Sequence, residues 1–229
     1  MDLDSTFKQK KIDSMRKFLI FVLSAVALYA TAQGRYCKNY DDFVAGQWTE
    51  LPTLNVIGHS ASHQVWAGGN DYKFDADDKT TNKILKKEAL LVEYQDTLYV
   101  NLRNLRYKKS LFGNGYAQGL VYDKDKIVFV THRIGSAVDG KRFASTFFLG
   151  FVGAAISETS IRNDRVCYLI DNNGDGKKTQ IVLLDDQFMN ELLSKNSRLM
   201  ERYKEKKKQK ERESAANVLP ILKELGFVE

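Results

Sequence analysis

The middle of the chain alternates between apolar and polar positions with the two-residue period of a β-strand. In the stretch LYVNL, Leu98, Val100 and Leu102 fall on one side of an extended backbone, which predicts a half-buried strand. The apolar stretch EALLVEY lies just before it, and only Gln95 and Asp96 separate the two. Because a two-residue gap between such runs is typical of a β-hairpin, the two stretches are expected to pair.

Two more pairs of apolar runs follow the same scheme. In residues 119–132, GLVYDKDKIVFVTH, the polar DKDK separates two β-like runs, and in residues 165–184 the runs RVCYLI and TQIVLL flank the polar DNNGDGK. Six strands in successive hairpins predict an antiparallel β-meander, either a sheet or a small open barrel, and disfavour a parallel Rossmann-like α/β fold.

The register of the last hairpin depends on where its turn lies. If Asp175-Gly176 forms a two-residue turn, Ile170 pairs with Ile181. A turn at Asn173-Gly174 is the alternative and shifts this pairing.

Residues 37–48, CKNYDDFVAGQW, predict a short helix near the start of the domain. Asn39 or Asp41 can cap this helix, and Gly46 can end it. The residues from 49 to 82 are rich in Gly, Ser, Asn and Asp, which predicts loops and edge strands, and the β pattern is expected to begin at Lys83.

A C-terminal helix is predicted after the last strand, where Asp185 and Asp186 supply a cap and an acidic first turn. Its apolar residues recur at three- and four-residue steps, which is typical of an amphipathic helix packed on a sheet. They are Phe188, Met189, Leu192, Leu193, Leu199, Met200 and Tyr203. The following KEKKKQKERE has no apolar face, so the helix is expected to run on into solvent before a short last helix, LPILKELG. The predicted fold class is therefore α+β.

Residues 144–157, ASTFFLGFVGAAIS, form an uncharged apolar run that interrupts the meander. The run is shorter than the ~18 residues that span a bilayer as a helix. It is either a buried helix or loop at one end of the sheet, or an exposed loop that contacts a membrane or a partner.

The N-terminal 32 residues have the layout of a secretory signal peptide. Met15-Arg16-Lys17 precedes the apolar run FLIFVLSAVAL, and Ala30-Thr31-Ala32 offers a small-x-small cleavage site. A signal anchor is the alternative, and Met15 is an alternative start of the chain. We therefore expect an exported protein of the periplasm or cell envelope of a Gram-negative bacterium, with no transmembrane span in the mature chain.

This layout also sets the expected domain organisation. Residues 1–32 form the signal peptide, residues 33–200 the β-rich domain with the packed start of the C-terminal helix, and residues 201–229 the basic helix and the short terminal helix.

The basic charge of the protein lies in one segment. The net charge is +6, and residues 1–32 carry five basic and three acidic side chains, which leaves 6 − 2 = +4 for the rest. Residues 202–213 alone carry seven basic and three acidic side chains, again +4. This segment either is a solvated helix with Lys–Glu pairs or contacts an anionic surface. It lacks the interleaved aromatic residues that stack on bases, so the expected partner is an envelope protein or an anionic surface and not a nucleic acid.

The protein has two cysteines, Cys37 and Cys167. Outside the cytoplasm they could form a disulfide, and the alternative is two separate buried thiols. Neither belongs to a C-x-x-C pair, so a catalytic or zinc-binding role is not expected.

Several of these segments together resemble a known group of proteins. The signal peptide, the sequence YDDF, the strand LYVNL and the ending LLSKNSRLMERYKEKK…VLPILKEL are similar to a family of uncharacterised exported proteins of Bacteroidota. The resemblance spans most of the mature chain. It implies a location and an architecture, and it implies no catalytic residues because the family has no assigned activity.

The nearest approach to a catalytic motif is VIGHSAS, a partial match to the nucleophile motif G-x-S-x-G. Ser60 would be the nucleophile and His132 its base, but Ser62 replaces the second glycine. Too few residues precede Ser60 for the upstream βα units of an α/β-hydrolase. A serine hydrolase that uses Ser60 and His132 is therefore only the enzymatic alternative.

His59 and His63 stand four residues apart, which is the spacing of two metal ligands on one face of a helix. The stretch HSASH lacks the glutamate of H-E-x-x-H, so histidines of a loop are the favoured interpretation.

The stretch DNNGDG matches the first half of a calcium-binding loop. Asp171, Asn173 and Asp175 offer oxygen ligands at alternate positions, and Gly176 permits the sharp turn between them. Val182 stands where a bidentate glutamate belongs. A structural hairpin turn is the favoured interpretation and a weak calcium site the alternative; no other cofactor is expected.

These patterns contain no complete catalytic constellation. The sequence therefore predicts a non-enzymatic binding or scaffold module of the periplasm or cell envelope. The alternatives are a serine hydrolase-like enzyme and a protein associated with the membrane surface.

Overall fold

The computed structural model describes residues 34–60, 63–64, 69–122, 125–135, 164–171 and 180–228. The strands are β1 Arg35–Cys37, β2 Thr49–Glu50, β3 Asn55–Gly58, β4 Tyr72–Asp75, β5 Leu91–Tyr94, β6 Thr97–Asn101, β7 Arg106–Tyr107, β8 Ser110–Leu111, β9 Tyr116–Tyr122, β10 Lys126–His132, β11 Arg165–Asp171 and β12 Gln180–Leu183. The helices are α2 Tyr40–Val44, α4 Lys79–Lys87, α7 Asp186–Leu192, α8 Ser197–Lys204, α9 Gln209–Arg212 and α10 Ala215–Glu224.

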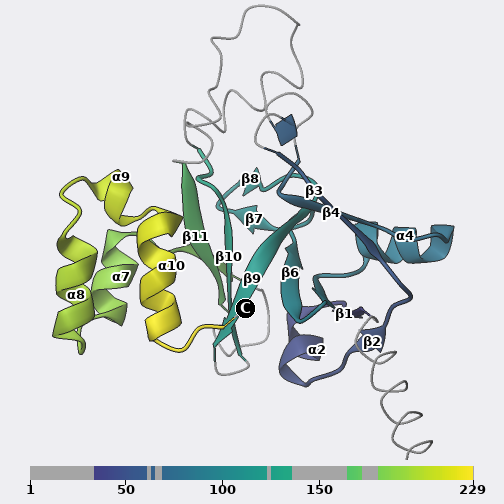
Figure 1. Cartoon of the computed structure of the whole chain (residues 1–229), viewed down its shortest axis with the longest axis horizontal. Helices are drawn as coiled ribbons and strands as arrows, with labels where there is room; N and C mark the ends of the chain where they lie inside the picture. The colour runs from purple at the N-terminus through teal and green to yellow at the C-terminus, as the bar shows by residue number, and fades with distance from the viewer. Residues whose placement is uncertain are drawn as a thin grey trace, which may run out of the picture.

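One antiparallel sheet organises the described part of the chain. Its main path runs β12-β11-β10-β9-β6-β5-β1-β2, and β3 and β4 join as a hairpin through a contact of β4 with β9. The sheet does not close into a barrel, and helices flank it at both ends (Figure 1). The predicted α+β class with an antiparallel meander is confirmed.

The β5–β6 hairpin has the two-residue turn that the sequence predicts. Tyr94 pairs with Thr97, and Gln95 and Asp96 between them have φ angles of 51° and 58°. Two consecutive left-handed residues make the turn whose twist matches that of the flanking strands. Leu98 is buried on the face that this turn directs inward.

The register of the β11–β12 hairpin is also confirmed. Ile170 lies opposite Ile181 and Leu169 opposite Val182, as the turn at Asp175-Gly176 requires. The turn itself belongs to residues 172–179, which lie outside the described residues.

One face of the sheet carries a continuous core, whereas the other face carries two. The continuous core includes Leu91, Leu98, Val100, Phe129, Tyr168 and Ile170, with Tyr40 and Phe43 of α2 and Phe112 packed on it. On the opposite face, Leu120, Val128, Cys167 and Leu169 meet the C-terminal helices. Farther along that face, Val92, Tyr94 and Tyr116 meet Phe74 of β4 and Leu85 of α4.

The N-terminal helix is confirmed as α2. Asn39 is its N-cap, and its side chain accepts a hydrogen bond from the backbone N of Asp42 at 2.8 Å. Gly46, just beyond the helix, has a φ of 68°, which glycine adopts without strain.

The sequence pattern did not predict helix α4 and placed the start of the β pattern at Lys83, within this helix. Asp78 caps α4 by accepting a hydrogen bond from the backbone N of Thr81, and Asn101 donates to the carbonyls of Leu85 and Ala89 at its other end. The helix was missed because Ile84 and Leu85 are its only large apolar residues, and polar residues fill the rest of KTTNKILKK. The β pattern begins at Leu91 instead.

The C-terminal segment forms four separate helices. The sequence pattern predicted one helix that runs on into solvent and a short last helix over LPILKELG, and α10 contains most of that last stretch. Asp185 caps α7 as predicted, but the chain turns after Leu193, and Asn196 caps α8 by accepting from the backbone N of Leu199. A second turn follows Lys204, and α10 then returns to the sheet. We call α7 to α10 the C-terminal lobe; Figure 1 shows it beside β9, β10 and β11.

Burial explains why the lobe folds back. Val218, Ile221 and Leu222 of α10 are fully buried in the same core as Met189 of α7 and Tyr203 of α8. Burying each large apolar side chain stabilises the fold by roughly 1.5–3 kcal/mol, which a helix projecting into solvent would forgo.

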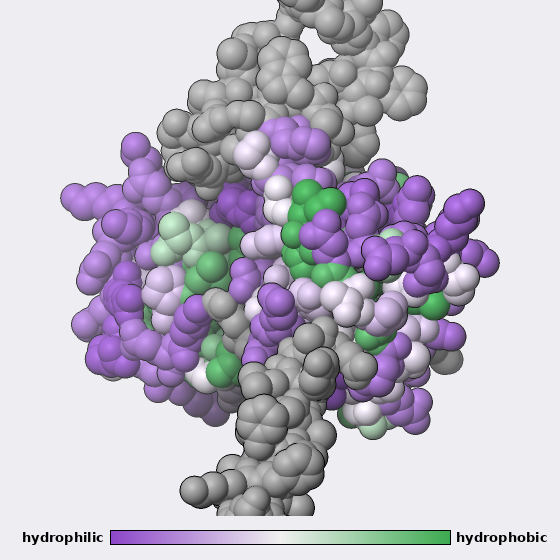
Figure 2. All heavy atoms as spheres, turned by 45° about the vertical axis from the view of Figure 1, so that its right-hand side comes forward, coloured by the Kyte–Doolittle hydropathy of each residue, from purple (hydrophilic) through white to green (hydrophobic). Residues whose placement is uncertain are grey.

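Other expectations fall on segments that the structure leaves undescribed. Residues 1–32 and residues 144–157 lie outside the described residues. Within the described ranges, no helix is long and apolar enough to cross a membrane. Figure 2 shows hydrophilic side chains over both ends of the described surface, with smaller hydrophobic areas between them.

Cys37 and Cys167 are separate thiols rather than a disulfide. Both are buried, and they belong to cores on opposite faces of the sheet. Of the two alternatives that the sequence left open, the structure has the buried thiols.

Candidate functional site

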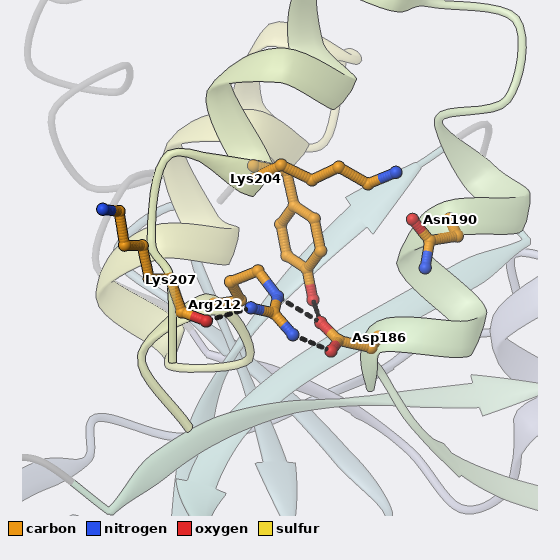
Figure 3. A pocket seen from close by; sticks show the side chains of 6 residues that line it. Asp186, Asn190, Lys204, Lys207 and Arg212 are labelled. Atoms are coloured by element: carbon orange, nitrogen blue, oxygen red, sulfur yellow. Dashed lines mark hydrogen bonds and ion pairs between the residues drawn. The ribbon is translucent and has the colours of Figure 1, made fainter. Parts of the chain in front are cut away.

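A pocket of about 360 Å³ lies in the C-terminal lobe, where the end of α8 and the turn after it face the start of α7 (Figure 3). Its volume is within the range of small-molecule sites. The pocket is lined by Asp186, Asn190, Tyr203, Lys204, Lys207 and Arg212.

Asp186 and Arg212 form the floor of this pocket. Arg212 Nε donates to Asp186 Oδ1 at 2.9 Å, and Arg212 Nη2 donates to Asp186 Oδ2. The Tyr203 hydroxyl also donates to Asp186 Oδ1, at 2.7 Å. The Asp186 carboxylate is thus held by a two-point contact of the kind that fixes a guanidinium in one orientation.

These contacts change the proton affinities of the pocket. The hydrogen bonds from Arg212 outweigh the effect of burial and hold the pKa of the Asp186 carboxyl below its usual range. Burial, with the nearby Asp186 carboxylate, raises the pKa of the Tyr203 hydroxyl. The pocket floor therefore contains an ionised carboxylate and a neutral phenol at neutral pH.

Arg212 also binds the backbone of the neighbouring turn. This turn is formed by residues 204–208, and we call it the lysine turn. Arg212 Nη1 donates to the carbonyl oxygens of Lys206 and Lys207 at 3.2 and 2.7 Å. Within the described part of the chain, Lys208 pairs with Glu211 at 3.6 Å, whereas Lys204, Lys206 and Lys207 are in no ion pair. The fold thus concentrates three exposed ammonium groups on one short turn.

Two further ion pairs connect α9, the helix that follows the lysine turn, to the sheet. Arg133 Nη2 donates to Glu213 Oε2 at 2.6 Å, and Lys210 lies 3.2 Å from Asp164, whose side chain is 1% exposed. Glu213 Oε1 also accepts from the backbone N of Asp186 at 2.9 Å. These contacts anchor the turn to the β10–β11 end of the sheet.

Asn190 contributes an unusual feature to the pocket wall. Among the described residues, nothing donates a hydrogen bond to its buried side-chain oxygen. In Figure 3 this oxygen lies on the side of Lys204, and the side-chain nitrogen lies on the side of Asp186. A buried acceptor without a donor is uncommon and calls for an explanation.

The candidate nucleophile Ser60 caps a short helical turn. Its Oγ accepts a hydrogen bond from the backbone N of His63 at 3.1 Å, and its carbonyl accepts one from the backbone N of Gln64 at 3.0 Å. Both contacts are those of a helix N-cap. Ser60 therefore has a structural role as a cap.

The candidate base His132 lies in a buried polar network. Its Nε2 is 2.8 Å from Gln64 Oε1, and Gln64 Nε2 donates to Asp71 Oδ1 at 2.9 Å. Because Gln64 presents its carbonyl oxygen, His132 carries the proton on Nε2. The structure thus brings Ser60 and His132 into the same region, where Gln64 separates them.

All three histidines gather around this network. The rings of His59 and His63 stack with centroids 4.2 Å apart, and His59 Nδ1 donates to the carbonyl of Asn70 at 2.8 Å. Asn70 in turn accepts a hydrogen bond from the Thr131 hydroxyl at 3.0 Å. Spacing in the sequence paired His59 with His63, and His132 entered only as the candidate base of Ser60.

The calcium hypothesis remains a prediction. Asp171 ends β11, whereas Asn173 and Asp175 lie outside the described residues. Within the described ranges, no group of three or more His, Cys, Asp or Glu side chains could hold a metal ion. Calorimetric titration with millimolar calcium tests the loop: no heat and no rise in Tm would remove the hypothesis.

A family model described as a family of unknown function (DUF6563) matches residues 35–229. The chain belongs to this family. The match begins at β1 and runs through α10, so the DUF6563 region includes both the pocket and the polar network. No curated protein and no solved structure matches the chain.

Only part of this candidate site could be located from the sequence. The charge count singled out residues 202–213, which contain Lys204, Lys207 and Arg212. Asp186 was identified only as part of a helix start, and Asn190 was not identified. No sequence signal could have joined them, because the pocket exists only once α8 packs beside α7.

Proposed function

We propose that this protein is a non-enzymatic binding module of the cell envelope that contacts an anionic surface through its lysine turn. The observation that supports this proposal best is the concentration of Lys204, Lys206 and Lys207 on a turn that Arg212 holds in place. A solvated helix with regular Lys–Glu pairs, the alternative drawn from the sequence, would have distributed and neutralised this charge.

The size of the expected effect follows from the number of unpaired lysines. Each lysine near an anionic lipid surface contributes about 1 kcal/mol, so three contribute about 3 kcal/mol, on the order of 100-fold in affinity. The attraction weakens with salt because the screening length falls from about 10 Å at 0.1 M to about 3 Å at 1 M.

The geometry of Ser60 and His132 supports the non-enzymatic part of the proposal. The Ser60 hydroxyl is used as a helix cap, and His132 Nε2 is bound to Gln64. Both contacts favour structural roles. The N-terminal sequence, with its basic, apolar and small-x-small order, supports the proposed export.

Vesicle co-sedimentation tests the anionic contact. The protein is mixed with vesicles of phosphatidylglycerol and phosphatidylcholine, and with vesicles of phosphatidylcholine alone. The test variant is Lys204→Gln/Lys206→Gln/Lys207→Gln. The matched control is Lys83→Gln/Lys86→Gln/Lys87→Gln, which removes the same charge from exposed lysines of α4 at the opposite end of the molecule (Figure 1).

The test variant is expected to lose on the order of 100-fold in affinity for the anionic vesicles, and the control is expected to keep it. Equal affinities of the two variants, or binding that does not weaken with salt, would overturn the proposal. Cell fractionation tests the location: a cytoplasmic pool alone would contradict export.

A further inference from the structure

The unpaired oxygen of Asn190 indicates what the pocket beside the lysine turn can recognise. We infer that this pocket takes a phosphate ester that carries a free hydroxyl, such as the headgroup of phosphatidylglycerol or a soluble polyol phosphate. The inference rests on the proposed function, because it specifies the chemical group that the lobe recognises on an anionic surface.

The anionic part of the ligand requires a cation of the pocket that no carboxylate neutralises. Asp186 is neutralised by Arg212, and the Tyr203 hydroxyl already donates to Asp186. Lys204 and Lys207 line the pocket without an ion pair among the described residues, and Figure 3 shows the Lys204 side chain extending over the pocket toward Asn190. Lys207 points outward in the same view. A single ammonium group at the mouth suits a monoanion or the edge of a phosphate.

Asn190 is the residue that can bind the hydroxyl of the ligand. Asn190 Oδ1 can only accept a hydrogen bond, and it has no donor among the described residues. The side-chain oxygen faces Lys204 and the nitrogen faces Asp186, which is the orientation that the two charges favour (Figure 3). A sulfate or a bare carboxylate has no proton to donate to this oxygen. A ligand that satisfies both groups therefore combines a negative charge with a nearby hydrogen-bond donor, and a hydroxyl supplies that donor.

A simpler alternative is that the flexible Lys204 side chain moves onto Asn190 and donates a hydrogen bond to its side-chain oxygen without a ligand. The two interpretations predict different stabilities for a variant that lacks the Asn190 amide. If Asn190 Oδ1 is unpaired in the free protein, Asn190→Ala leaves the stability unchanged or raises it, since an orphaned acceptor is lost. If Lys204 satisfies it, the same variant is destabilised.

The experiment uses two lipids of equal charge that differ in the hydroxyl. Vesicles contain phosphatidylcholine with either phosphatidylglycerol or phosphatidylmethanol, whose headgroup lacks hydroxyls. The unchanged protein is expected to prefer phosphatidylglycerol by about five- to tenfold, the effect of one hydrogen bond to a buried acceptor. Asn190→Ala is expected to bind both vesicles equally, with its salt-dependent attraction intact.

Calorimetry with soluble probes separates the two sources of the group. Glycerol 3-phosphate carries both features, glycerol lacks the charge, and sulfate lacks the hydroxyl. If glycerol 3-phosphate is the one probe of the three that binds, and Asn190→Ala abolishes this binding, the isolated group suffices. Lipid discrimination without soluble binding shows that the membrane-bound headgroup is needed.

Two results would overturn the inference. The first is equal binding of the two anionic lipids by the unchanged protein together with no binding of glycerol 3-phosphate. The second is destabilisation of Asn190→Ala in urea unfolding without ligand. Neither result affects the lysine-turn proposal, which is decided by the Lys204/Lys206/Lys207 variant and its α4 control.

Discussion

Arg165 of β11 and Asp71, the residue before β4, form a two-point ion pair across the seam between the two cores on one face of the sheet. Arg165 Nη1 donates to Asp71 Oδ1 at 2.6 Å, and Arg165 Nη2 donates to Asp71 Oδ2 and, at 3.2 Å, to the carbonyl of Val130. The side chains are 26% and 16% exposed. The pair therefore joins the β3–β4 hairpin to the strands that support the C-terminal lobe.

Removal of either charge should destabilise the fold more than removal of both. Asp71→Ala leaves the Arg165 guanidinium without its partner, and we expect a loss of about 3 kcal/mol in the free energy of unfolding. Asp71→Leu combined with Arg165→Met should lie closer to the unchanged protein. Urea unfolding of both single variants and the double variant gives the coupling, and additive effects would contradict the role assigned to the pair.

Asp186 should make the C-terminal lobe sensitive to acid. Its folded-state pKa is lowered by Arg212, so its contribution to stability is present above the unfolded pKa of about 3.9 and is lost as the pH falls through the folded value. We expect the stability difference between the unchanged protein and Asp186→Asn to be constant near neutral pH and to shrink below about pH 4. Arg212→Gln should reduce that pH dependence, and the Tyr203 hydrogen bond and the Lys204 charge should preserve part of it. A difference that persists at low pH would contradict the contact.

Gly115 is required by its backbone and its surroundings. It has a φ of +104°, and a Cβ placed there would lie 2.9 Å from the carbonyl oxygen of Tyr72. Gly115→Ala should therefore destabilise the protein by about 1–3 kcal/mol. Gly58→Ala is the control, because a Cβ there meets nothing within 4 Å; its effect should stay within about 0.5 kcal/mol. Thermal unfolding measures both, and equal effects would refute the requirement.

The two cysteines should be inert in the folded protein. Burial raises the pKa of each thiol, Cys37 and Cys167, to about 12. At pH 8 the reactive thiolate is then about one part in ten thousand. We expect negligible alkylation in native buffer and modification of two thiols after unfolding without reductant. Unfolded protein that yields no thiols would instead reveal a disulfide.

The parts of the fold that the sequence predicted are those that local interactions determine. The Gln95-Asp96 turn, the pairing of Ile170 with Ile181 and the Asp185 cap each depend on residues close together in the chain. Alternation of apolar residues fixes which face of a strand is buried, and a shift of one residue would reverse it. These elements therefore follow from pattern alone.

The parts that the sequence did not predict depend on distant contacts. Helix α4 is stabilised by Asn101, which lies beyond the next strand, and only two of its own residues, Ile84 and Leu85, are large and apolar. The lobe turns back because α10 buries its apolar residues on the sheet. The pocket results from that turn, so its position could not be read from the charges of residues 202–213 even though those charges were noticed.

The hydrogen bonds from Arg212 to the backbone of the lysine turn affect how strongly this basic segment can bind. Fixing the backbone of one residue costs about 1–2 kcal/mol in conformational entropy, comparable to what one lysine gains from an anionic membrane. In a disordered tail of the same composition, the entropy lost on contact would offset much of the free energy that its lysines gain. Here Arg212 already holds the carbonyls of Lys206 and Lys207 in the folded protein, so the backbone loses its conformational entropy during folding. The free energy of attraction of the lysines then contributes to binding without that offset.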